Sequence, residues 1–316
     1  MKKYMLADFE SFEVLDGRIQ CPTGDYTDIL EFPANCDFSM HCRFGKCCSF
    51  GELCRFGGHC SFGAECGFGK CCSFGEDCCF GKCCSFGELC RFGERCSFGK
   101  CCSFGEECSF GEYCRFGAVC SFGEGCCSGE GCSFGEDCSF GKRCSFGECC
   151  SFGERCGFGK CCSFGEECSF GEYCRFGVWC SFGEECSFGE GCSFGEDCSF
   201  GKRCSFGECC SFGERCGFGE CCSFGERCGF GERCIVEGKY TMFDFVQFGR
   251  FGSENRATYI FLTNNGLYVR CGCFIGTIDE FAEKVKETHG NSQYAKEYLM
   301  MIELAKLRLE GRENEN

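Results

Sequence analysis

Thiols are the most abundant reactive groups in this sequence, which contains 47 cysteines among 316 residues. Most of them occupy one position of a six-residue repeat, Cys-x-Phe-Gly-x-x, which we call a hexad and whose cysteine recurs without a break from Cys36 to Cys234. Because this cysteine alternates with a large aromatic residue, we expect it to be a small, buried and reduced core residue. A ladder of disulfides between neighbouring coils is the alternative for an oxidising compartment. Metal storage is a third interpretation, disfavoured because thiolate ligands must be accessible and convergent.

Histidine is the other group that could bind a metal or transfer protons, and the chain has three. His41, His59 and Asp77 follow one another at intervals of three hexads. They are weak candidates for a metal site, because a straight row of ligands does not surround an ion. A surface coincidence is the simpler interpretation. The sequence leads us to name no catalytic residue, no cofactor-binding residue and no cofactor.

The spacing of the phenylalanines indicates which elements hold these groups. Phenylalanine follows the repeat cysteine by two residues from Phe38 to Phe230, with Ser128 as the single exception. Side chains two apart in an extended strand point to the same side, so Cys and Phe should both point inward. The following Gly permits a sharp change of direction or a close approach of two backbones. The chain can bury its phenylalanines only by coiling on itself, which predicts an all-β solenoid with a packing defect at Ser128.

The hexad resembles a known repeat. The segment Phe44-Gly45-Lys46-Cys47-Cys48-Ser49 is similar to the pattern of the hexapeptide-repeat family, with Phe where that family favours Leu, Ile or Val. The resemblance covers about two-thirds of the chain and implies a left-handed, triangular parallel β-helix with three hexads per coil, hence about eleven coils. Many members of that family are acyltransferases with a catalytic His and loops that leave the coils. This repeat has no insertion, so an acyltransferase-like enzyme is only a third interpretation.

In a coil of three hexads, residues separated by three hexads stack on the outer surface. Leu53 and Leu89, with Cys71 between them, would form an apolar stripe that seats a partner or part of the N-terminal segment. Cys83 and Cys101 would lie on one edge in adjacent coils and are the pair to test for reactivity. The remaining cysteines expected at corners, and therefore more exposed, are Cys47, Cys149, Cys161, Cys209 and Cys221.

The charge of the chain is strongly acidic, with a formal net charge of −16. The first position after the repeat glycine holds 21 Glu and 7 Lys among its 32 sites between residues 46 and 232. Stacked like charges repel each other, so this acidity indicates selection for solubility or for a basic protein partner. It disfavours direct binding of nucleic acid, which needs a basic surface. The candidate partner-surface glutamates are Glu106, Glu112, Glu166 and Glu172.

A duplication at an offset of ten hexads bears on this surface, since Lys100 to Gly117 recurs at Lys160 to Gly177. Ten is not a multiple of the three hexads in a coil. The two copies should therefore lie on different faces of a triangular solenoid. This favours a spacer or a diffuse charged surface over one patterned face.

The two ends of the chain depart from the repeat, and we expect an N-terminal cap over residues 1–23, the solenoid over 24–236 and a small α+β domain over 237–316. Phe9, Phe12 and Val14 are available to cover the first coil, because an open solenoid end exposes its core.

The C-terminal segment predicts a β-hairpin followed by two helices. Asn265-Gly266 forms the tight turn of the hairpin, and Thr277 with Glu280 makes a capping box for the first helix. The strands and helix faces are expected from the following residues: Thr258 to Leu262 and Leu267 to Arg270 in the hairpin; Ile278, Phe281 and Val285 in the first helix; Tyr294, Tyr298, Ile302 and Ala305 in the second. Cys271 and Cys273 should serve strand packing.

These observations favour a non-catalytic structural or interaction scaffold, a rigid acidic rod with a C-terminal module that binds a protein or mediates self-association. The alternative is an acidic decoy that mimics nucleic acid and inhibits a DNA- or RNA-binding protein. We expect a cytoplasmic protein without membrane contact, since no apolar stretch is long enough to span a bilayer and acidic residues interrupt the N-terminus. The terminal segments are similar to those of uncharacterised bacterial and phage proteins.

Overall fold

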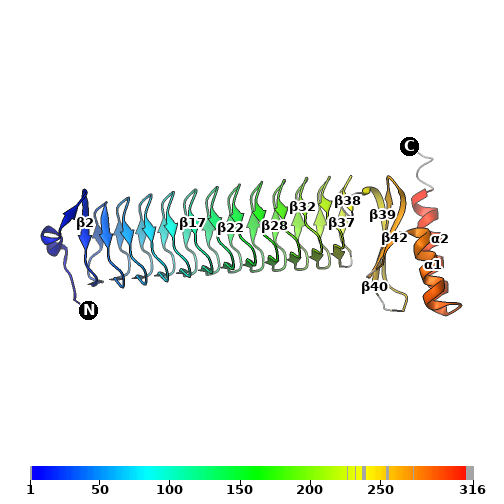
Figure 1. Cartoon of the computed structure of the whole chain (residues 1–316), viewed down its shortest axis with the longest axis horizontal. Helices are drawn as coiled ribbons and strands as arrows, with labels where there is room; N and C mark the ends of the chain where they lie inside the picture. Colours follow the sequence, from blue (N-terminus) through cyan, green and yellow to red (C-terminus); the bar gives the residue numbers. More distant parts are fainter. Residues whose placement is uncertain are drawn as a thin grey trace. The chain divides into compact units, whose positions relative to one another are not determined.

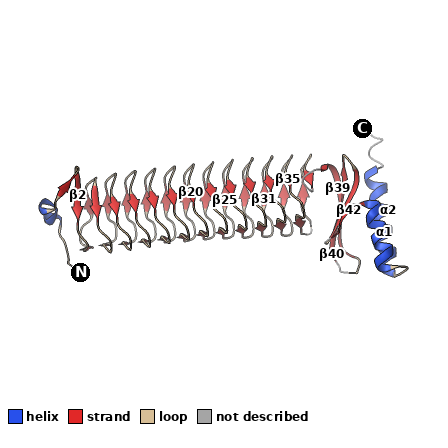
Figure 2. Cartoon of the chain, viewed as in Figure 1, coloured by secondary structure: helices blue, strands red, loops and turns tan. Residues whose placement is uncertain are grey.

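The structure is a computed structural model that describes residues 2–225, 227–231, 233–236, 240–253, 256–272 and 274–310. The repeat folds into a parallel β-solenoid of about 12 coils, followed by a small region of strands and helices (Figures 1 and 2). This confirms the predicted fold class. The chain divides into two compact units, Met1–Gly177 and Val178–Asn316, and each unit is described by itself.

The strands of the solenoid are short and regularly spaced. From β6 (Arg43–Phe44) to β28 (Arg175–Phe176), each strand consists of the two residues before a repeat glycine. Strands separated by three hexads pair in parallel, so that β8 (Arg55–Phe56) lies against β11 (Ser73–Phe74) with the two phenylalanines in register. Three hexads therefore complete one coil, as the resemblance to the hexapeptide repeat implied.

The first coil begins earlier than the first repeat cysteine. The strand β2 (Arg18–Cys21) pairs in parallel with β5 (Cys36–Phe38), and Cys21 takes a buried inward position opposite Phe38. The strands β3 (Asp25–Tyr26) and β4 (Glu31–Phe32) complete that coil by pairing with the coil above. The solenoid is therefore slightly longer than the eleven coils expected.

The interior is filled by stacked rings. Phe56 stacks on Phe74 of the next coil with ring centroids 4.8 Å apart and planes 2° apart. The same ring meets Phe62, the next phenylalanine along the chain, edge-on at 5.1 Å and 86°. Both arrangements are favourable for aromatic pairs. Because neighbouring rings within a coil are nearly perpendicular, three phenylalanines per coil fit a narrow core.

The repeat glycine is required by the close approach of successive coils. A Cβ atom on Gly63 would lie 2.5 Å from the carbonyl oxygen of Gly45 in the preceding coil. The change of direction comes two residues after the glycine, where Leu53 and Val119 have φ angles of 60° and 62°. Left-handed backbone is unfavourable for most residues and worst for a β-branched one. The sequence left both roles open for the glycine, and the structure assigns it the close approach.

Backbone hydrogen bonds join each coil to the next at strands and corners alike. Ser73 donates to the Cys54 carbonyl at 2.9 Å and Gly75 donates to the Phe56 carbonyl at 2.8 Å. At the corner, Leu53 donates to the Lys70 carbonyl at 2.9 Å. The corners are thus hydrogen-bonded in register, as the strands are. Residues three hexads apart therefore lie beside each other in successive coils.

The N-terminal segment covers the first coil with aromatic rings. It contains the 3-10 helix η1 (Leu6–Ser11) and the strand β1 (Val14–Leu15), which pairs with β2. Tyr4 stacks on Tyr26 at 5.1 Å, and Phe9 meets the same ring at 6.2 Å. Phe9 and Phe12 lie at this end as predicted, but Val14 is 63% exposed. Tyr4 takes the place expected of Val14, because β1 points its first side chain into solvent.

The second unit ends in a four-stranded antiparallel sheet. Its strands are β39 (Tyr240–Phe251), β40 (Arg256–Thr263), β41 (Gly266–Cys271) and β42 (Phe274–Thr277), paired in chain order. The last solenoid strand, β38 (Ile235–Val236), pairs antiparallel with β39. The Phe230 ring, in the last coil, meets Phe245 at 5.1 Å and Phe261 at 6.0 Å. The sheet therefore closes this end of the aromatic core.

Two helices cover the other face of this sheet. The helix α1 (Ile278–His289) starts with the predicted capping box, in which Glu280 donates its N–H to Thr277 Oγ1 at 3.3 Å. The helix α2 (Gln293–Glu310) buries Tyr298, Ile302 and Ala305 as predicted, but Tyr294 is 46% exposed. Tyr294 was wrongly expected in the core: in the first turn of the helix the neighbouring Ala295 is buried instead. The strands β39 and β42 were not predicted.

Across the described residues, none of the helices is both long and apolar enough to cross a lipid bilayer.

Candidate functional site

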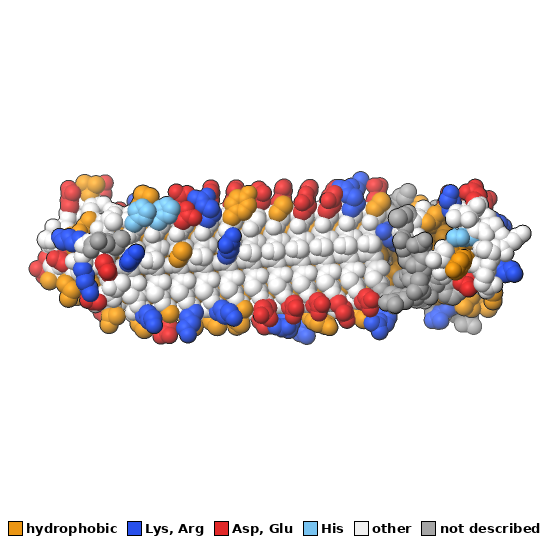
Figure 3. All heavy atoms as spheres, turned by 90° about the horizontal axis from the view of Figure 1, so that it is seen from below, with side chains coloured by type: hydrophobic (Ala, Val, Ile, Leu, Met, Phe, Trp, Pro, Cys, Tyr) orange, Lys and Arg blue, Asp and Glu red, His pale blue; other side chains and the backbone are white. Residues whose placement is uncertain are grey.

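Carboxylates gather at the corners of the coils, and Figure 3 shows acidic side chains lining the edges of the face drawn. The carbonyl oxygen of a first corner residue accepts a hydrogen bond from the second corner residue of the preceding coil, as in Cys149 N–H to Glu166 at 2.9 Å. This contact aligns six exposed glutamates, each one coil from the next, on one edge of the first unit. We call them the Glu ladder: Glu76, Glu94, Glu112, Glu130, Glu148 and Glu166.

The four glutamates named from the sequence are all exposed, but they do not form one site. Glu112 and Glu166 belong to the Glu ladder, whereas Glu106 and Glu172 lie on other edges of the coils. None of the four carboxylates forms an ion pair within the described part of the chain. The property they share is an unneutralised negative charge at a corner.

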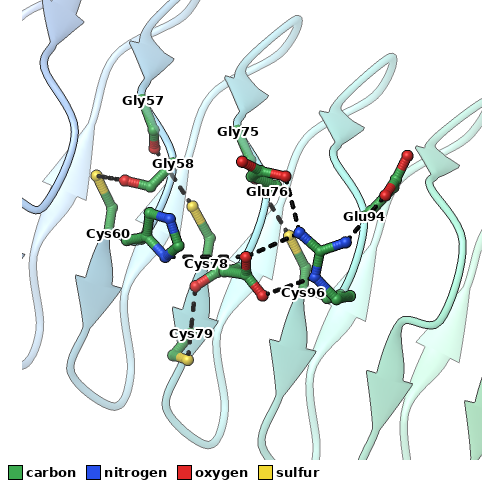
Figure 4. A network of polar contacts seen from close by, with 12 residues as sticks. Gly57, Gly58, Cys60, Gly75, Glu76, Cys78, Cys79, Glu94 and Cys96 are labelled. Carbon is green, nitrogen blue, oxygen red and sulfur yellow. Dashed lines mark hydrogen bonds and ion pairs between the residues drawn. The ribbon is translucent and has the colours of Figure 1, made fainter.

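Several arginines neutralise corner carboxylates in the described part of the chain, and three of them form the same cluster. Arg95 contacts Glu76 at 2.8 Å, Asp77 at 3.0 Å and Glu94 at 3.1 Å. In Figure 4, Glu76 and Glu94 reach from neighbouring coils toward one guanidinium group. Arg155 and Arg215 repeat these contacts with the carboxylates ten and twenty hexads further on: Glu136, Asp137, Glu154, Glu196, Asp197 and Glu214.

These arginines affect the titration of the aspartates beside them. Hydrogen bonds from Arg95 lower the pKa of Asp77 below its ordinary value, and Arg155 and Arg215 do the same for Asp137 and Asp197. The groups are exposed, so solvent screens the interaction and each cluster contributes little to stability. The clusters therefore have only a small and local effect on stability.

The three residues proposed as a metal row do stack on one edge. The rings of His41 and His59 are 4.9 Å apart at 9°, and His59 Nδ1 lies 3.8 Å from Asp77. Ligand atoms of His59, Glu76 and Asp77 lie within 4.8 Å of one another. However, Arg95 already occupies both carboxylates with a positive charge.

The third copy of this cluster clarifies the role of the histidine. Trp179 stands one coil before Asp197, as His59 does before Asp77, and its indole N–H donates to that carboxylate at 3.1 Å. A tryptophan indole cannot ligate a metal through this N–H. In both copies a ring nitrogen faces the aspartate, and in the third copy this nitrogen is an indole N–H that donates to the carboxylate, which favours an ion-pair and hydrogen-bond network over a metal centre.

The inward cysteines are buried, and their thiols bond to the backbone. Cys78 is fully buried and donates to the Gly57 carbonyl at 3.5 Å. Hydrogen bonds with the thiols of Cys60 and Cys96, together with burial, raise the pKa of Cys78. All cysteines in the described residues are free thiols. The inward thiols are buried and inaccessible, which makes them poorly suited to nucleophilic chemistry.

The corner cysteines are accessible, with Cys209 half-buried and the others exposed. Cys83 donates its N–H to Lys100 at 2.9 Å, which places Cys83 and Cys101 in the same register on adjacent coils. Two further exposed cysteines, Cys79 and Cys127, were missed. Each replaces the outward serine that usually follows the repeat cysteine. A second cysteine directly after the repeat cysteine was therefore the signal that could have identified them.

The C-terminal region contains a cavity of ≈ 250 Å³ between its sheet and helices, lined by Ser253, Cys271, Gly272, Phe281, Lys284, Val285, Thr288, His289 and Tyr298. Thr258 donates its hydroxyl to Cys271 Sγ at 3.1 Å, and the His289 ring lies over Tyr298 at 5.7 Å. Burial raises the pKa of Tyr298. Cys273, named with Cys271 from the sequence, lies outside the described residues. These contacts are those of packing side chains.

Comparison of the chain with protein-family models, with curated proteins and with solved structures gives no match.

Proposed function

We propose that the protein is a non-catalytic scaffold whose acidic corners bind a basic protein partner. The observation that carries this proposal is the Glu ladder. Its members Glu112, Glu130, Glu148 and Glu166 are exposed in four successive coils and form no ion pair within the described residues. Strands in a sheet lie about 4.8 Å apart, so the carboxylates repeat at that interval and their mutual repulsion is unfavourable. A complementary row of lysines or arginines would relieve this repulsion on binding.

The solenoid itself supports a role as a spacer or platform. Every hexad in the first solenoid segment, from β6 to β28, turns after two strand residues, and no loop leaves these described coils. A regular surface of this kind offers many equivalent contacts and no enclosed pocket for chemistry. We further propose that the solenoid is left-handed, that it is a variant of the hexapeptide repeat, and that the protein acts in the cytoplasm.

A nucleic-acid decoy is the second candidate, favoured by the regular row of charges. A single row such as the Glu ladder gives one charge about every 4.8 Å, whereas duplex DNA carries one charge per about 1.7 Å of its axis. A decoy would therefore have to combine charges from more than one edge. This mismatch ranks the decoy below a general basic partner.

Self-association through the C-terminal domain is proposed from one face of α2. Met300, Leu304 and Leu307 are 72%, 54% and 76% exposed, at intervals of four and three residues. Apolar residues at this spacing form one stripe on a helix, typical of helix–helix contacts. Sedimentation velocity of Leu304→Lys against wild type tests the idea: loss of a concentration-dependent dimer supports it, and a wild-type monomer at high concentration contradicts it.

The main proposal is tested with charge-neutralised variants. We would change Glu112, Glu130, Glu148 and Glu166 to Gln together, and prepare a control with the same change of net charge in α1 and α2, at Glu283, Glu287, Glu297 and Glu303. Proteins retained from a source-cell lysate would be eluted with increasing salt. We expect the ladder variant, but not the control, to lose a salt-released basic protein. Equal retention by both variants contradicts the proposal, and displacement of the retained protein by duplex DNA would favour the decoy.

A further inference from the structure

One segment of the sequence occurs twice in the first unit, at a distance of two coils. Glu-Leu-Cys-Arg-Phe stands at residues 52–56 and again at 88–92, and the coil between them carries Lys-Cys-Cys-Ser-Phe at 70–74. The parallel register places Ser73 between Arg55 and Arg91. The outer coils therefore carry large side chains where the middle coil carries small ones.

This alternation leaves a notch in the surface of the solenoid. Leu53 and Arg55 form one wall, Leu89 and Arg91 form the other, and the floor consists of Cys71, Cys72 and Ser73, with Arg18 closing one end. The notch has a volume of ≈ 320 Å³. Walls two coils apart are separated by about 10 Å between backbones. A space of this size is at the lower end of the range for small-ligand sites.

The charge of the notch differs from that of the rest of the chain. Arg55 and Arg91 form no ion pair within the described residues and are exposed. Two carboxylates of neighbouring coils are already paired: Asp37 with Arg18 at 2.5 Å and Glu88 with Lys70 at 2.9 Å. The notch is thus a cationic site on an acidic protein.

The apolar side of the notch lies directly beside the arginines. Leu53 and Leu89 are 46% and 45% exposed at the corners before Arg55 and Arg91. Arg18 donates to the Leu53 carbonyl at 2.5 Å, which fixes the wall on that side. The stripe named from the sequence at Leu53 and Leu89 is therefore one half of a two-sided site.

We propose that this notch binds a small organic oxyanion that carries an apolar substituent. Guanidinium groups of Arg55 and Arg91 donate to the oxyanion from both walls, and the Ser73 hydroxyl donates from the floor. Arginine suits phosphate and carboxylate because its planar fork makes paired, charge-assisted hydrogen bonds. The apolar substituent lies over Cys71 between the two leucines, where it loses contact with water.

Other outward arginines lack this arrangement, which supplies a matched control. Arg115 occupies the same strand position as Arg55, but both its neighbours in the sheet, Ser97 and Ser133, are serines. It is therefore a single exposed arginine with no second wall. Replacing it changes the net charge as replacing Arg55 does, without altering the notch.

The experiment is a calorimetric titration of the full chain, in phosphate-free buffer, with phenyl phosphate, benzoate, inorganic phosphate and phenol. We expect phenyl phosphate to bind more tightly than inorganic phosphate, and phenol not to bind. Benzoate shows whether a planar carboxylate is accepted as well as a phosphate. Arg55→Gln and Arg91→Gln should each weaken phenyl phosphate binding about tenfold or more, because each removes a charge-assisted hydrogen bond. Arg115→Gln should leave the affinity unchanged.

A filled-notch variant separates a built site from general attraction of anions. Cys71→Leu combined with Ser73→Arg gives all three coils the same pattern, so it adds positive charge while removing the space. Our proposal predicts loss of phenyl phosphate binding in this variant at an unchanged melting temperature. Tighter binding by the filled variant, equal weakening by Arg115→Gln, or no binding by wild type would each overturn the proposal.

Discussion

The solenoid and the C-terminal region solve the same packing problem in different ways. In the solenoid, each ring meets copies of itself: Phe56 contacts Phe74 and Phe62 at distances that recur throughout the described coils. In the C-terminal region, the core combines different residues from a sheet and two helices, such as Ile260, Phe281 and Met301. The periodic core can be extended or interrupted one coil at a time, whereas the heterogeneous core depends on all its members together.

The first prediction concerns the close approach of coils, and has the largest expected effect. Gly159→Ala should destabilise the protein by about 3 kcal/mol, because its Cβ would lie 2.7 Å from the backbone of Gly141, which cannot move aside. Gly157→Ala, two residues earlier, should be nearly neutral, since a Cβ there meets nothing within 4 Å. Chemical denaturation of both variants measures the difference. Equal effects would contradict the assigned role of the repeat glycine.

Core truncation in each region sharpens the comparison. Phe98→Ala and Phe281→Ala should each cost about 3–5 kcal/mol, because both rings are buried. Hydrogen exchange should then differ between them. We expect faster exchange in only the coils adjacent to residue 98, but throughout β39–β42, α1 and α2 for the change at residue 281. A uniform increase along the solenoid for Phe98→Ala would show that its coils are not independent.

At Ser128 we expect a substitution to stabilise the core, in contrast to the truncations at Phe98 and Phe281. A small void of ≈ 10 Å³ lies beside it, lined by rings that include Phe110 and Phe146, and its buried hydroxyl has no hydrogen-bond partner among the described residues. The packing defect predicted from the sequence is thus confirmed. Ser128→Phe should stabilise the protein by about 1.5–3 kcal/mol, as a buried Phe gains contact and the unpaired hydroxyl is removed. A lower midpoint of denaturation would show that the void cannot accept the ring.

The corner backbone predicts a smaller stabilisation. Val119 is exposed and has a φ of 62°, a conformation that a β-branched residue adopts only with strain. Val119→Gly should therefore stabilise the protein by about 1 kcal/mol, in line with the glycine already present at residue 125, where φ is 71°. Gly125→Val is the reverse test and should destabilise to a similar extent.

The arginine clusters should have the smallest effect. The folded pKa of Asp77 is below its ordinary value of 3.8, so its contribution to stability is present above that value and is lost as the pH falls through the folded pKa. Arg95→Gln should flatten this part of the pH dependence of the melting temperature, while Arg115→Gln should not. An identical pH profile for Arg95→Gln and wild type would contradict the lowered pKa.

The repeat made the solenoid predictable because one rule, that residues two apart share a side, applies to every hexad. It placed Phe56, Cys54 and the void at Ser128 correctly. The repeat could not show whether the glycine allows the chain to change direction or allows neighbouring coils to approach closely, because both roles require a residue without a Cβ atom. It also missed β39, whose long strand lies in a segment without a flanking turn motif, and Tyr4, which covers the first coil from outside the repeat.

The candidate sites were predictable only in part, for a related reason. The spacing of three hexads placed His41, His59 and Asp77 on one edge, but it did not predict that Arg95, the same distance beyond Asp77, pairs with that aspartate. The sequence predicted only a stripe of leucines where the structure has the notch. The leucines are corner residues and Arg55 and Arg91 are outward strand residues, and the two positions were considered separately.

The central claim, that three hexads form one coil with Phe and Cys inside, is best tested by cross-linking of exposed thiols. In the starting variant, Cys83 and Cys101 are kept and the other exposed cysteines are changed to serine. Two comparison variants also carry Cys101→Ser. One of them adds Arg95→Cys, two hexads from Cys83, and the other adds Glu107→Cys, four hexads from Cys83. Mass spectrometry after treatment with a short thiol-specific cross-linker should show a link between residues 83 and 101 alone, with the inward cysteines unmodified. Equal links at separations of two or four hexads, or rapid labelling of the inward cysteines in the folded protein, would contradict the coil.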